Sequence, residues 1–318
     1  MQMNFETLSR MIAGYRPARV LHVASSLDIF TILARQPMTA EALAGVCKAK
    51  PDMLEKILIV CTAMELLAKN GDRYRTTPFA NTYLVRGSKL YQGHIIAHSA
   101  SLWDSWGALE FTVRSAPKPP EDVHRNFIMG MYDLSMAGRA KVLADSVDLA
   151  GRKKLVDVGG GPGTYSIELC RRFPSLSAAI FDLPETVAIA REVIEAEGMG
   201  DRVSVIAGDW DTDGFGEGND VVLMSNILHG PGSKADMKLG KAFASMAAGG
   251  LLIIQDFLLN DDKTGPLVPA LFNIMLGAFS RPELFALIEQ AGFVKPRVLS
   301  TIDEAGSLVI EAEKPCAQ

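Results

Sequence analysis

Residues 156–166 read VDVGGGPGTYS, and this stretch decides how the second half of the chain folds. An apolar run, KLVDV, leads into it, and an amphipathic helical pattern, TYSIELCRRF, follows it. A glycine-rich loop between a buried strand and a helix is typical of nucleotide-binding α/β folds. The dinucleotide pattern G-x-G-x-x-G would need glycine at position 164, where Thr164 stands, so the loop disfavours a nicotinamide cofactor.

Strand and helix patterns alternate from residue 153 to the end of the chain. We expect strands at residues 154–160, 177–183, 202–209, 220–228, 250–259 and 307–315, and helices at residues 164–173, 184–198, 233–249 and 281–293. This alternation predicts an α/β fold with a doubly wound, Rossmann-like parallel sheet and helices on both faces. Ligands of such sheets bind beyond the carboxyl ends of the strands, so the site should follow the strand ends.

The first half of the chain has a different pattern, which is mostly helical. Residues 17–34 and 50–71 have helical periodicity, and Thr39 is a good N-cap for a helix between them. Residues 66–78 read as a small hairpin that turns at Asn70, so the region predicts a winged helix. Its second helix carries a single basic residue before Lys50, which favours packing or dimerisation over DNA binding.

A proline-rich connector, RSAPKPPED at residues 114–122, separates the two rhythms. We therefore expect a helical, winged-helix-like dimerisation domain at residues 1–115 and a nucleoside-binding domain at residues 116–318. An alternative for the first domain is a regulator that senses a small molecule, but the missing basic recognition helix counts against it.

Composition and net charge bear on whether the protein binds nucleic acid, membranes or metal ions. The net charge is −5 and no block of lysine or arginine occurs, which argues against a nucleic-acid partner. The longest apolar runs are too short to cross a bilayer, and the first residues lack the pattern of a secretory signal, so we expect no membrane partner. The four cysteines are scattered without a C-x-x-C pair. This pattern fits a cytoplasmic protein without a disulfide framework or a metal clip.

Acidic residues follow three successive predicted strands. Asp157 ends the first strand, Asp182 the second, and Asp209 the third, where Trp210 comes next. One such aspartate alone would be read as a solvated turn residue, but three beside a glycine loop favour a nucleoside site. Asp182 stands where a ribose-binding acid is expected, and a carboxylate at Asp157 would suit a ligand with an ammonium group. Trp210 could pack against an adenine ring.

These motifs in combination resemble the class I S-adenosylmethionine-dependent methyltransferases, in particular the small-molecule O-methyltransferases such as caffeate and acetylserotonin O-methyltransferases. The resemblance rests on VDVGGGPGTYS, FDLP, AGDW, SNILH and GGLLIIQDFLL. It extends to the first half, where ARVLHVASSLDIFTILARQPMTAEALA resembles the dimerisation domain and NFIMGM the F-x-x-x-M helix of that family. The resemblance implies a homodimer that uses S-adenosylmethionine and releases S-adenosylhomocysteine.

The resemblance also implies roles for individual residues of the cofactor site. The glycine loop would hold the methionine portion, Asp182 the ribose hydroxyls, and Asp209 with Trp210 the adenine. The cofactor-binding residues expected on this basis are Asp157, Gly159, Gly161, Gly163, Asp182, Leu183, Asp209, Trp210 and Ser225.

His229 follows the fourth predicted strand, where the family has the base that removes the proton of the acceptor hydroxyl. A phenol has a pKa of about 10, so little of it is nucleophilic at neutral pH without a base. Asp256, on the next strand, falls where the family places the carboxylate that orients this histidine. The resemblance therefore implies O-methylation with His229 and Asp256 as the catalytic pair.

Three positions depart from the family pattern and keep an alternative open. Gly230 and Pro231 replace the usual Asp-Trp after the histidine, and Ala278 stands where a second acid often occurs. The alternative is C-methylation or another S-adenosylmethionine-dependent tailoring reaction, in which His229 only positions the substrate.

Bulky apolar residues in the flanking helices are candidates for the acceptor site. They are Trp103, Phe127, Met131, Phe272 and Met275. Methionine and aromatic side chains suit a planar, largely apolar acceptor, although each of them could equally be an ordinary core residue. His94 and His98 are four residues apart on one expected helix, but no third ligand is in view, so we expect no metal.

Overall fold

The computed structural model describes residues 3–302 and 306–316. The chain divides into two compact units, Met1–Pro120 with Leu259–Met275, and Glu121–Leu258 with Leu276–Gln318. The boundary thus lies five residues beyond the expected one, and residues 259–275 return to the first unit instead of continuing the second. Contacts within the first unit explain this return: Lys69 Nζ donates to the carbonyl of Asp262 (2.8 Å), and the Arg16 guanidinium lies 5.1 Å from the centre of the Phe272 ring.

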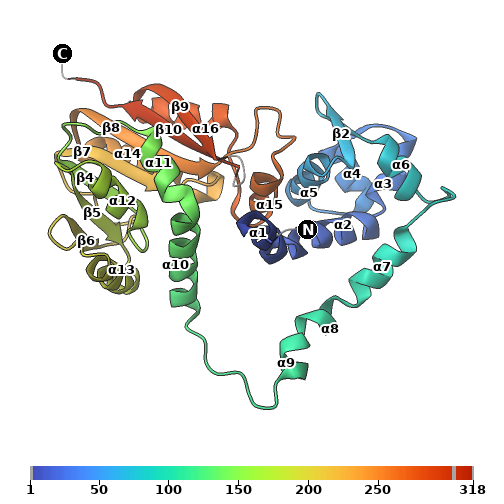
Figure 1. Cartoon of the computed structure of the whole chain (residues 1–318). Helices are drawn as coiled ribbons and strands as arrows, with labels where there is room; N and C mark the ends of the chain where they lie inside the picture. Colours follow the sequence, from blue (N-terminus) through green and yellow to red (C-terminus); the bar gives the residue numbers. More distant parts are fainter. Residues whose placement is uncertain (1–2, 303–305, 317–318) are drawn as a thin grey trace. The chain divides into compact units, whose positions relative to one another are not determined.

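The first unit is helical with one small sheet (Figure 1). Its helices are α1 (Phe5–Ala13), α2 (Tyr15–Ser26), α3 (Ile29–Arg35), α4 (Ala40–Cys47), α5 (Pro51–Ala63), α6 (Pro78–Tyr83), α7 (Gly93–Ser101), α8 (Trp103–Gly107), α9 (Leu109–Val113) and α15 (Leu267–Leu276). Its strands are β1 (Met38–Thr39), β2 (Leu67–Asn70) and β3 (Arg73–Thr76), in the antiparallel order β1-β3-β2. This arrangement matches the expected winged helix.

Local chemistry fixes the ends of these helices. Thr39 caps α4, since its hydroxyl accepts a hydrogen bond from the amide of Ala42 at 3.2 Å. The expected helix at residues 50–71 ends earlier, at Ala63, because Glu65 adopts a left-handed backbone (φ 59°) and β2 then pairs with β3. The expected helix at residues 17–34 is divided into α2 and α3 at Asp28, which is also left-handed (φ 55°).

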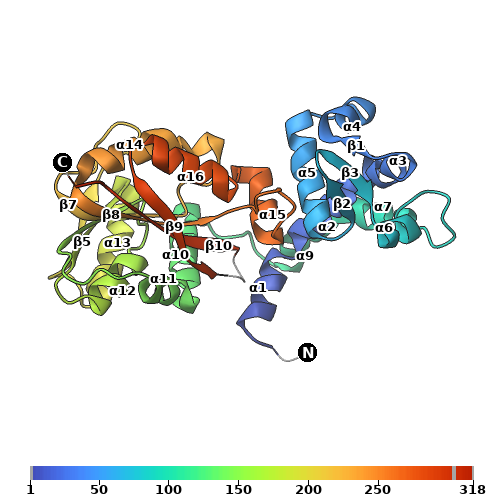
Figure 2. The same ribbon diagram turned by 90° about the horizontal axis from the view of Figure 1, so that it is seen from above.

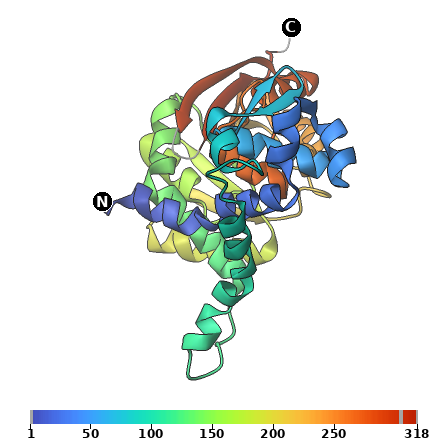
Figure 3. The ribbon, with the colours of Figure 1, turned by 90° about the vertical axis from the view of Figure 1, so that its right-hand side faces the viewer.

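In the segment α7–α9, helix α7 contacts α2, and α8 and α9 extend away from the rest of the unit (Figures 1 and 3). It carries exposed apolar side chains, including Trp106 and Phe111, whose exposed fractions are 70% and 85%. Among the described residues, no single helix is long and apolar enough to span a membrane, although the bent pair Phe5–Ser26 and Ile29–Arg35 together meets the criteria of length and composition.

The second unit is a seven-stranded mixed sheet between helices. The strands are β4 (Lys154–Val158), β5 (Ser177–Asp182), β6 (Val203–Ala207), β7 (Asn219–Ser225), β8 (Met246–Phe257), β9 (Val294–Ile302) and β10 (Ser307–Glu313). The helices are α10 (Val123–Leu134), α11 (Ala140–Ser146), α12 (Thr164–Arg172), α13 (Pro184–Ala196), α14 (Ala235–Ser245) and α16 (Arg281–Gln290), with shorter turns at η1 (Ser135–Arg139) and η2 (Pro231–Ser233). The Rossmann-like class is confirmed.

The strand order is β6-β5-β4-β7-β8-β10-β9, and β4 to β8 are parallel. The expectation of a parallel sheet was wrong for β10, which runs antiparallel to both β8 and β9. Strand β9 was not expected at all. It includes Lys295, Pro296 and Arg297 and lies at the edge of the sheet, so it lacks the apolar run of a central strand.

Alternating residues of the central strands enter two separate cores. Val221 and Leu223 of β7 pack with α11, α12 and α13, whereas Val222 and Met224 pack with α14 and α16. Figure 2 shows α14 and α16 on one side of the sheet and α11 and α12 on the other. Strand β4 lies between β5 and β7, so the order in which the chain adds strands reverses at β4. Ligands of such sheets bind at this reversal, beyond the carboxyl end of β4.

Candidate active site

A cavity of about 270 Å³ lies within the second unit, where β4, β5 and β7 end. Helix α10 and the glycine loop form its walls. It brings together most of the residues that the sequence proposed for the cofactor. Those that line it are Gly159, Gly161, Asp182, Leu183, Trp210 and Ser225, together with the acceptor candidates Phe127 and Met131.

Asp157 lies beneath the loop and is fully buried instead of facing the cavity. A Cβ atom on Gly160 would come within 2.7 Å of its carboxyl carbon, which shows how closely the loop covers it. The Ser166 hydroxyl donates to Asp157 Oδ2 at 2.7 Å, while Oδ1 has no hydrogen-bond partner among the residues that the structure describes. Burial raises the pKa of Asp157 to about 7; the Ser166 hydrogen bond opposes this rise and the nearby Asp182 adds to it.

Gly163 and Asp209 also lie outside the lining of the cavity. Gly163 precedes α12 with a φ of 80°, and a Cβ atom there would meet Ile180 Cδ1 at 2.2 Å. It therefore shapes the loop through steric fit. Asp209 accepts a hydrogen bond from the amide of Asp211 at 2.8 Å, so it stabilises the turn after β6.

Asp182 presents a carboxylate that the glycine loop holds in place. Its Oδ2 accepts a hydrogen bond from the amide of Gly161 (2.8 Å), and its Oδ1 accepts one from the amide of Leu183 (2.7 Å). Burial raises the pKa of this carboxyl group, and the two amides lower it. Thr186 and His124, which the sequence reasoning did not single out, line the cavity nearby and contact each other at 3.2 Å (Oγ1 to Nε2).

Trp210 packs against the loop, since a Cβ atom on Gly159 would come within 2.9 Å of its ring. The ammonium of Lys238 lies 4.1 Å from the centre of one Trp210 ring and donates to the carbonyl of Ile227 at 2.9 Å. This cation–π contact and hydrogen bond connect Trp210 to the segment after β7. The same segment carries His229.

His229 and Asp256 are in direct contact. Nδ1 of His229 lies 2.8 Å from Oδ1 of Asp256, which is fully buried. Asp256 also accepts hydrogen bonds from the amides of Leu228 (to Oδ2) and Phe257 (to Oδ1), both at 2.8 Å. Since a carboxylate accepts, Nδ1 is assigned as the donor, which leaves Nε2 as a free acceptor. The His229 ring stacks on the Phe257 ring, with 6.2 Å between the ring centres. Neither His229 nor Asp256 is among the residues that line the cavity.

The backbone of His229 is held by the segment 277–279. Its carbonyl accepts a hydrogen bond from the amide of Phe279 at 2.8 Å. A Cβ atom on Gly230 would meet the amide nitrogen of Ala278 at 2.8 Å, so only glycine fits there without a shift. Ala278 itself is buried in this contact. The nearby Glu283 accepts from the amide of Ser280 at 2.8 Å and thus caps α16.

The remaining acceptor candidates, Trp103, Phe272 and Met275, lie in the first unit. Trp103 meets the ring of His22 edge-on at 6.0 Å, and Phe272 lies under the guanidinium of Arg16. Met275 is largely exposed at the end of α15. Their assignment to the acceptor remains a prediction.

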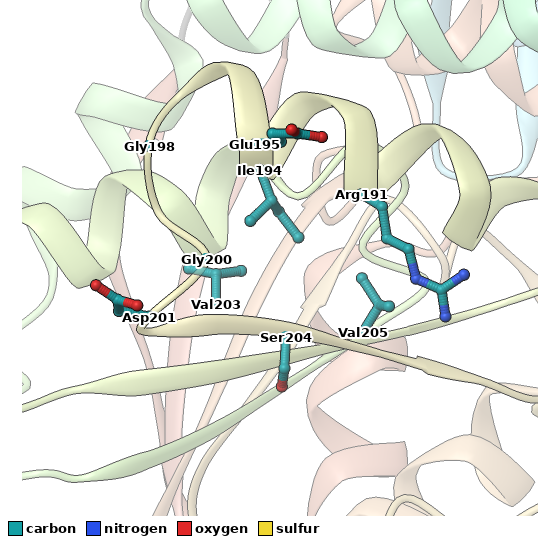
Figure 4. A pocket seen from close by; sticks show the side chains of 9 residues that line it. All are labelled: Arg191, Ile194, Glu195, Gly198, Gly200, Asp201, Val203, Ser204 and Val205. Carbon is teal, nitrogen blue, oxygen red and sulfur yellow. The ribbon is translucent and has the colours of Figure 1, made fainter.

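A second groove, of about 460 Å³, lies between α13 and the edge strand β6 (Figure 4). Arg191 and Asp201 lie at opposite ends of its row of labelled side chains. No histidine–carboxylate contact like that of His229 and Asp256 occurs among its lining residues. In the described part of the chain, no group of three histidine, cysteine or acidic side chains is arranged to hold a metal ion.

Comparison with known proteins agrees with this architecture. The sequence model of an O-methyltransferase domain matches residues 102–294, and that of an O-methyltransferase dimerisation domain matches residues 9–86. A 3-hydroxy-5-methyl-1-naphthoate 3-O-methyltransferase from Streptomyces sahachiroi is 36% identical, over 86% of this chain and 84% of its own. The N,N-dimethyltransferase OxyT from Streptomyces rimosus is 29% identical, and the match covers 97% of this chain and 96% of OxyT.

A solved structure gives the same result for the fold. An O-methyltransferase family 2 protein from Planctomyces limnophilus, in complex with apigenin, superposes with a TM-score of 0.79. It is 29% identical in sequence, and the match covers 99% of this chain and 97% of that one.

Asp157 should make stability depend on pH. Because its pKa rises to about 7 in the fold, the folded chain keeps a proton there that the unfolded chain loses above about pH 4. Stability should therefore fall as pH rises from about 4 to about 7. Asp157→Asn, which resembles the protonated acid, should flatten this slope in thermal unfolding, whereas the exposed control Asp133→Asn should not. Equal slopes for Asp157→Asn and the native chain would contradict the burial argument.

Gly230→Ala should displace His229. The added methyl group would collide with the backbone of Ala278, and the Phe279 amide that holds the His229 carbonyl lies beside it. A displacement of about 1 Å can cost about 100-fold in rate, so kcat should fall at least tenfold while calorimetric affinity for the cofactor stays near native. Gly232→Ala is the matched control, because a Cβ atom there has open space. If both variants turn over equally, the close contact at Gly230 does not position the histidine.

Proposed function

The chain belongs to the O-methyltransferase family, and we propose that it methylates a hydroxyl group of a small, largely apolar aromatic molecule with His229 as the general base. The observation that carries this proposal is the hydrogen bond of 2.8 Å between His229 Nδ1 and the buried Asp256, at the end of the strand beside the glycine loop. Methyl transfer from S-adenosylmethionine is the activity of the family.

The donor set of the cavity fits S-adenosylmethionine. The Asp182 carboxylate would accept hydrogen bonds from the ribose hydroxyls, and Trp210 would pack against the adenine. Gly161 leaves room for the methionine portion, since no described atom lies within 4 Å of a Cβ position there. When bound, the cofactor supplies an electrophilic methyl group on a sulfonium sulfur.

His229 would remove the proton of the acceptor hydroxyl through Nε2. The contact with Asp256 places the hydrogen of the neutral imidazole on Nδ1 and so leaves the lone pair on Nε2. A base matters because a phenol with a pKa of about 10 is mostly protonated at neutral pH. Such a base typically contributes about 10²–10⁴ in rate.

Asp256 would orient the imidazole and stabilise it once it carries the proton. Amides of Leu228 and Phe257 fix both carboxylate oxygens, so the side chain cannot rotate away from His229. Because Asp256 is fully buried, water competes little for its oxygens. The ring of Phe257 covers one side of the imidazole.

The comparisons support an aromatic acceptor with a hydroxyl group. The Streptomyces sahachiroi relative acts on a hydroxynaphthoate, and the Planctomyces limnophilus structure holds the flavone apigenin. Phe127 and Met131 of the cavity suit the ring of such an acceptor.

An alternative reaction methylates an atom that is already nucleophilic. The N,N-dimethyltransferase OxyT matches nearly the whole chain, and Gly230, Pro231 and Ala278 depart from the usual family residues. In this alternative, a nitrogen or carbon atom accepts the methyl group and His229 only positions the substrate.

The catalytic proposal predicts that His229 and Asp256 act as a unit. His229→Ala should lower kcat by about 10²–10⁴, with little change in cofactor affinity. Asp256→Asn should lose a good part of the same factor, and the double variant should be scarcely slower than His229→Ala alone. The measurement is the formation of S-adenosylhomocysteine with a panel of phenols, hydroxynaphthoates and flavones.

His94→Ala, which changes an exposed histidine on α7, is the matched control and should turn over as the native enzyme does. Near-native turnover of His229→Ala on the preferred acceptor would reject the base and favour the alternative. Additive losses in the double variant would show that the two residues do not work together.

We further propose that the first unit forms a homodimer. Residues 9–86 match the dimerisation domain, and the α7–α9 segment exposes Trp106 and Phe111 to an extent that is unusual for a monomer. Association of two copies would remove this apolar surface from water.

The Trp106→Ser/Phe111→Ser variant should therefore weaken the dimer. Sedimentation velocity at micromolar concentration should give a dimer for the native chain and a larger monomer fraction for the variant. Ile206→Ser removes an exposed apolar side chain on β6 and should leave the dimer intact. A monomeric native chain would refute the proposal, and an undiminished dimer in the double variant would place the interface elsewhere.

A further inference from the structure

The helix that forms one wall of the cavity ends in an irregular turn. Phe127, Met131, Ser135 and Arg139 recur every four residues from α10 into η1, and all four line the cavity. The chain kinks at Ser135–Arg139, between α10 and α11, where Gly138 has a non-helical φ of 125°. Here the turn ends at Arg139, the last member of the series.

Arg139 is half-buried, and among the described residues no carboxylate pairs with it. Its guanidinium carbon lies 5.9 Å from the centre of the Phe257 ring, and it also interacts electrostatically with Tyr165. Two exposed arginines of the same unit do have carboxylate partners, since Arg125 binds Glu192 and Arg171 binds Glu197. Burial lowers the pKa of Arg139, so the fold bears the cost of holding this charge away from water.

Among the described residues, no ion pair joins Arg139 to Asp182, the carboxylate of the cavity lining. Asp182 accepts hydrogen bonds from the amides of Gly161 and Leu183 instead. The Phe257 ring contacts Arg139 and also stacks on the His229 ring, with 6.2 Å between the two ring centres. Arg139 and the proposed base therefore contact the same aromatic ring. Arg139 therefore presents its charge at the wall of the cavity in which a small molecule would bind.

We propose that Arg139 binds a carboxylate of a small molecule held in this cavity. The guanidinium offers a planar pair of donors that matches a carboxylate, and the half-buried setting strengthens such a pair. Two sources fit this chemistry if the proposed function holds: the carboxylate of the methionine portion of the cofactor, and a carboxylate on an aromatic acceptor.

The first experiment compares S-adenosylmethionine with its decarboxylated form by calorimetry. If the ligand is the methionine carboxylate, the native enzyme should bind the decarboxylated form about 10- to 100-fold more weakly. Arg139→Gln should then bind both forms with the weaker affinity, and Arg139→Lys should recover part of the difference. Arg125→Gln removes a cation of α10 that does not line the cavity, and this variant should behave as the native enzyme does.

The second experiment measures the binding of a hydroxynaphthoate and of its methyl ester in the presence of S-adenosylhomocysteine. If the ligand is the acceptor carboxylate, Arg139→Gln should keep native affinity for S-adenosylmethionine. It should bind the hydroxynaphthoate at least tenfold more weakly and the ester unchanged.

Two results would overturn the proposal. Native affinities of Arg139→Gln for every probe would mean that the guanidinium is only solvated. Equal losses for carboxylated and uncarboxylated probes, with no preference in the native enzyme, would mean that Arg139 acts on the fold instead. These experiments measure binding without turnover, so they are independent of whether His229 is the base.

Discussion

The buried carboxylate of Asp256 is the group on which the geometry of the site depends. It accepts hydrogen bonds from the amides of Leu228 and Phe257 and contacts His229 Nδ1, so one side chain joins the segment after β7 to the end of β8. These bonds satisfy a charge that would otherwise be costly to bury. They also orient the imidazole. The carboxylate that accepts from the two backbone amides also accepts from Nδ1 of His229, so the hydrogen of the neutral ring lies on Nδ1.

The glycine loop provides the second constraint, and it works through steric fit. Gly160 and Gly163 have no room for a side chain, because Asp157 and Ile180 press against them from the sheet. The loop therefore lies close on β4 and β5, and the amide of Gly161 reaches Asp182. Backbone contact thus creates a cavity whose polar groups are already oriented before any ligand enters, which is the arrangement that favours tight and specific binding.

The alternating pattern from residue 153 was sufficient to predict the Rossmann-like class. The resemblance to the O-methyltransferases paired His229, which follows β7, with Asp256 of β8. Other features have no local signal. Strand β9 carries Lys295 and Pro296 at an edge, where burial does not impose apolar residues. The burial of Asp157 depends on a loop that folds back over it, and the irregular turn that ends at Arg139 depends on Gly138 in a tertiary setting. The return of residues 259–275 to the first unit is likewise a long-range contact.

The central claim is that Asp256 holds His229 with its hydrogen on Nδ1 and a free Nε2, ready to accept a proton. Nitrogen NMR of the enzyme labelled at histidine tests this directly, with the His229 signals assigned by their loss in His229→Gln. In mildly alkaline buffer the account predicts that Nδ1 of His229 carries the hydrogen and that Nε2 does not. In Asp256→Asn, the ring should instead show a mixture of the two neutral tautomers, as a free imidazole does. A hydrogen on Nε2 in the native enzyme would contradict the account, because that nitrogen could not then accept the acceptor proton.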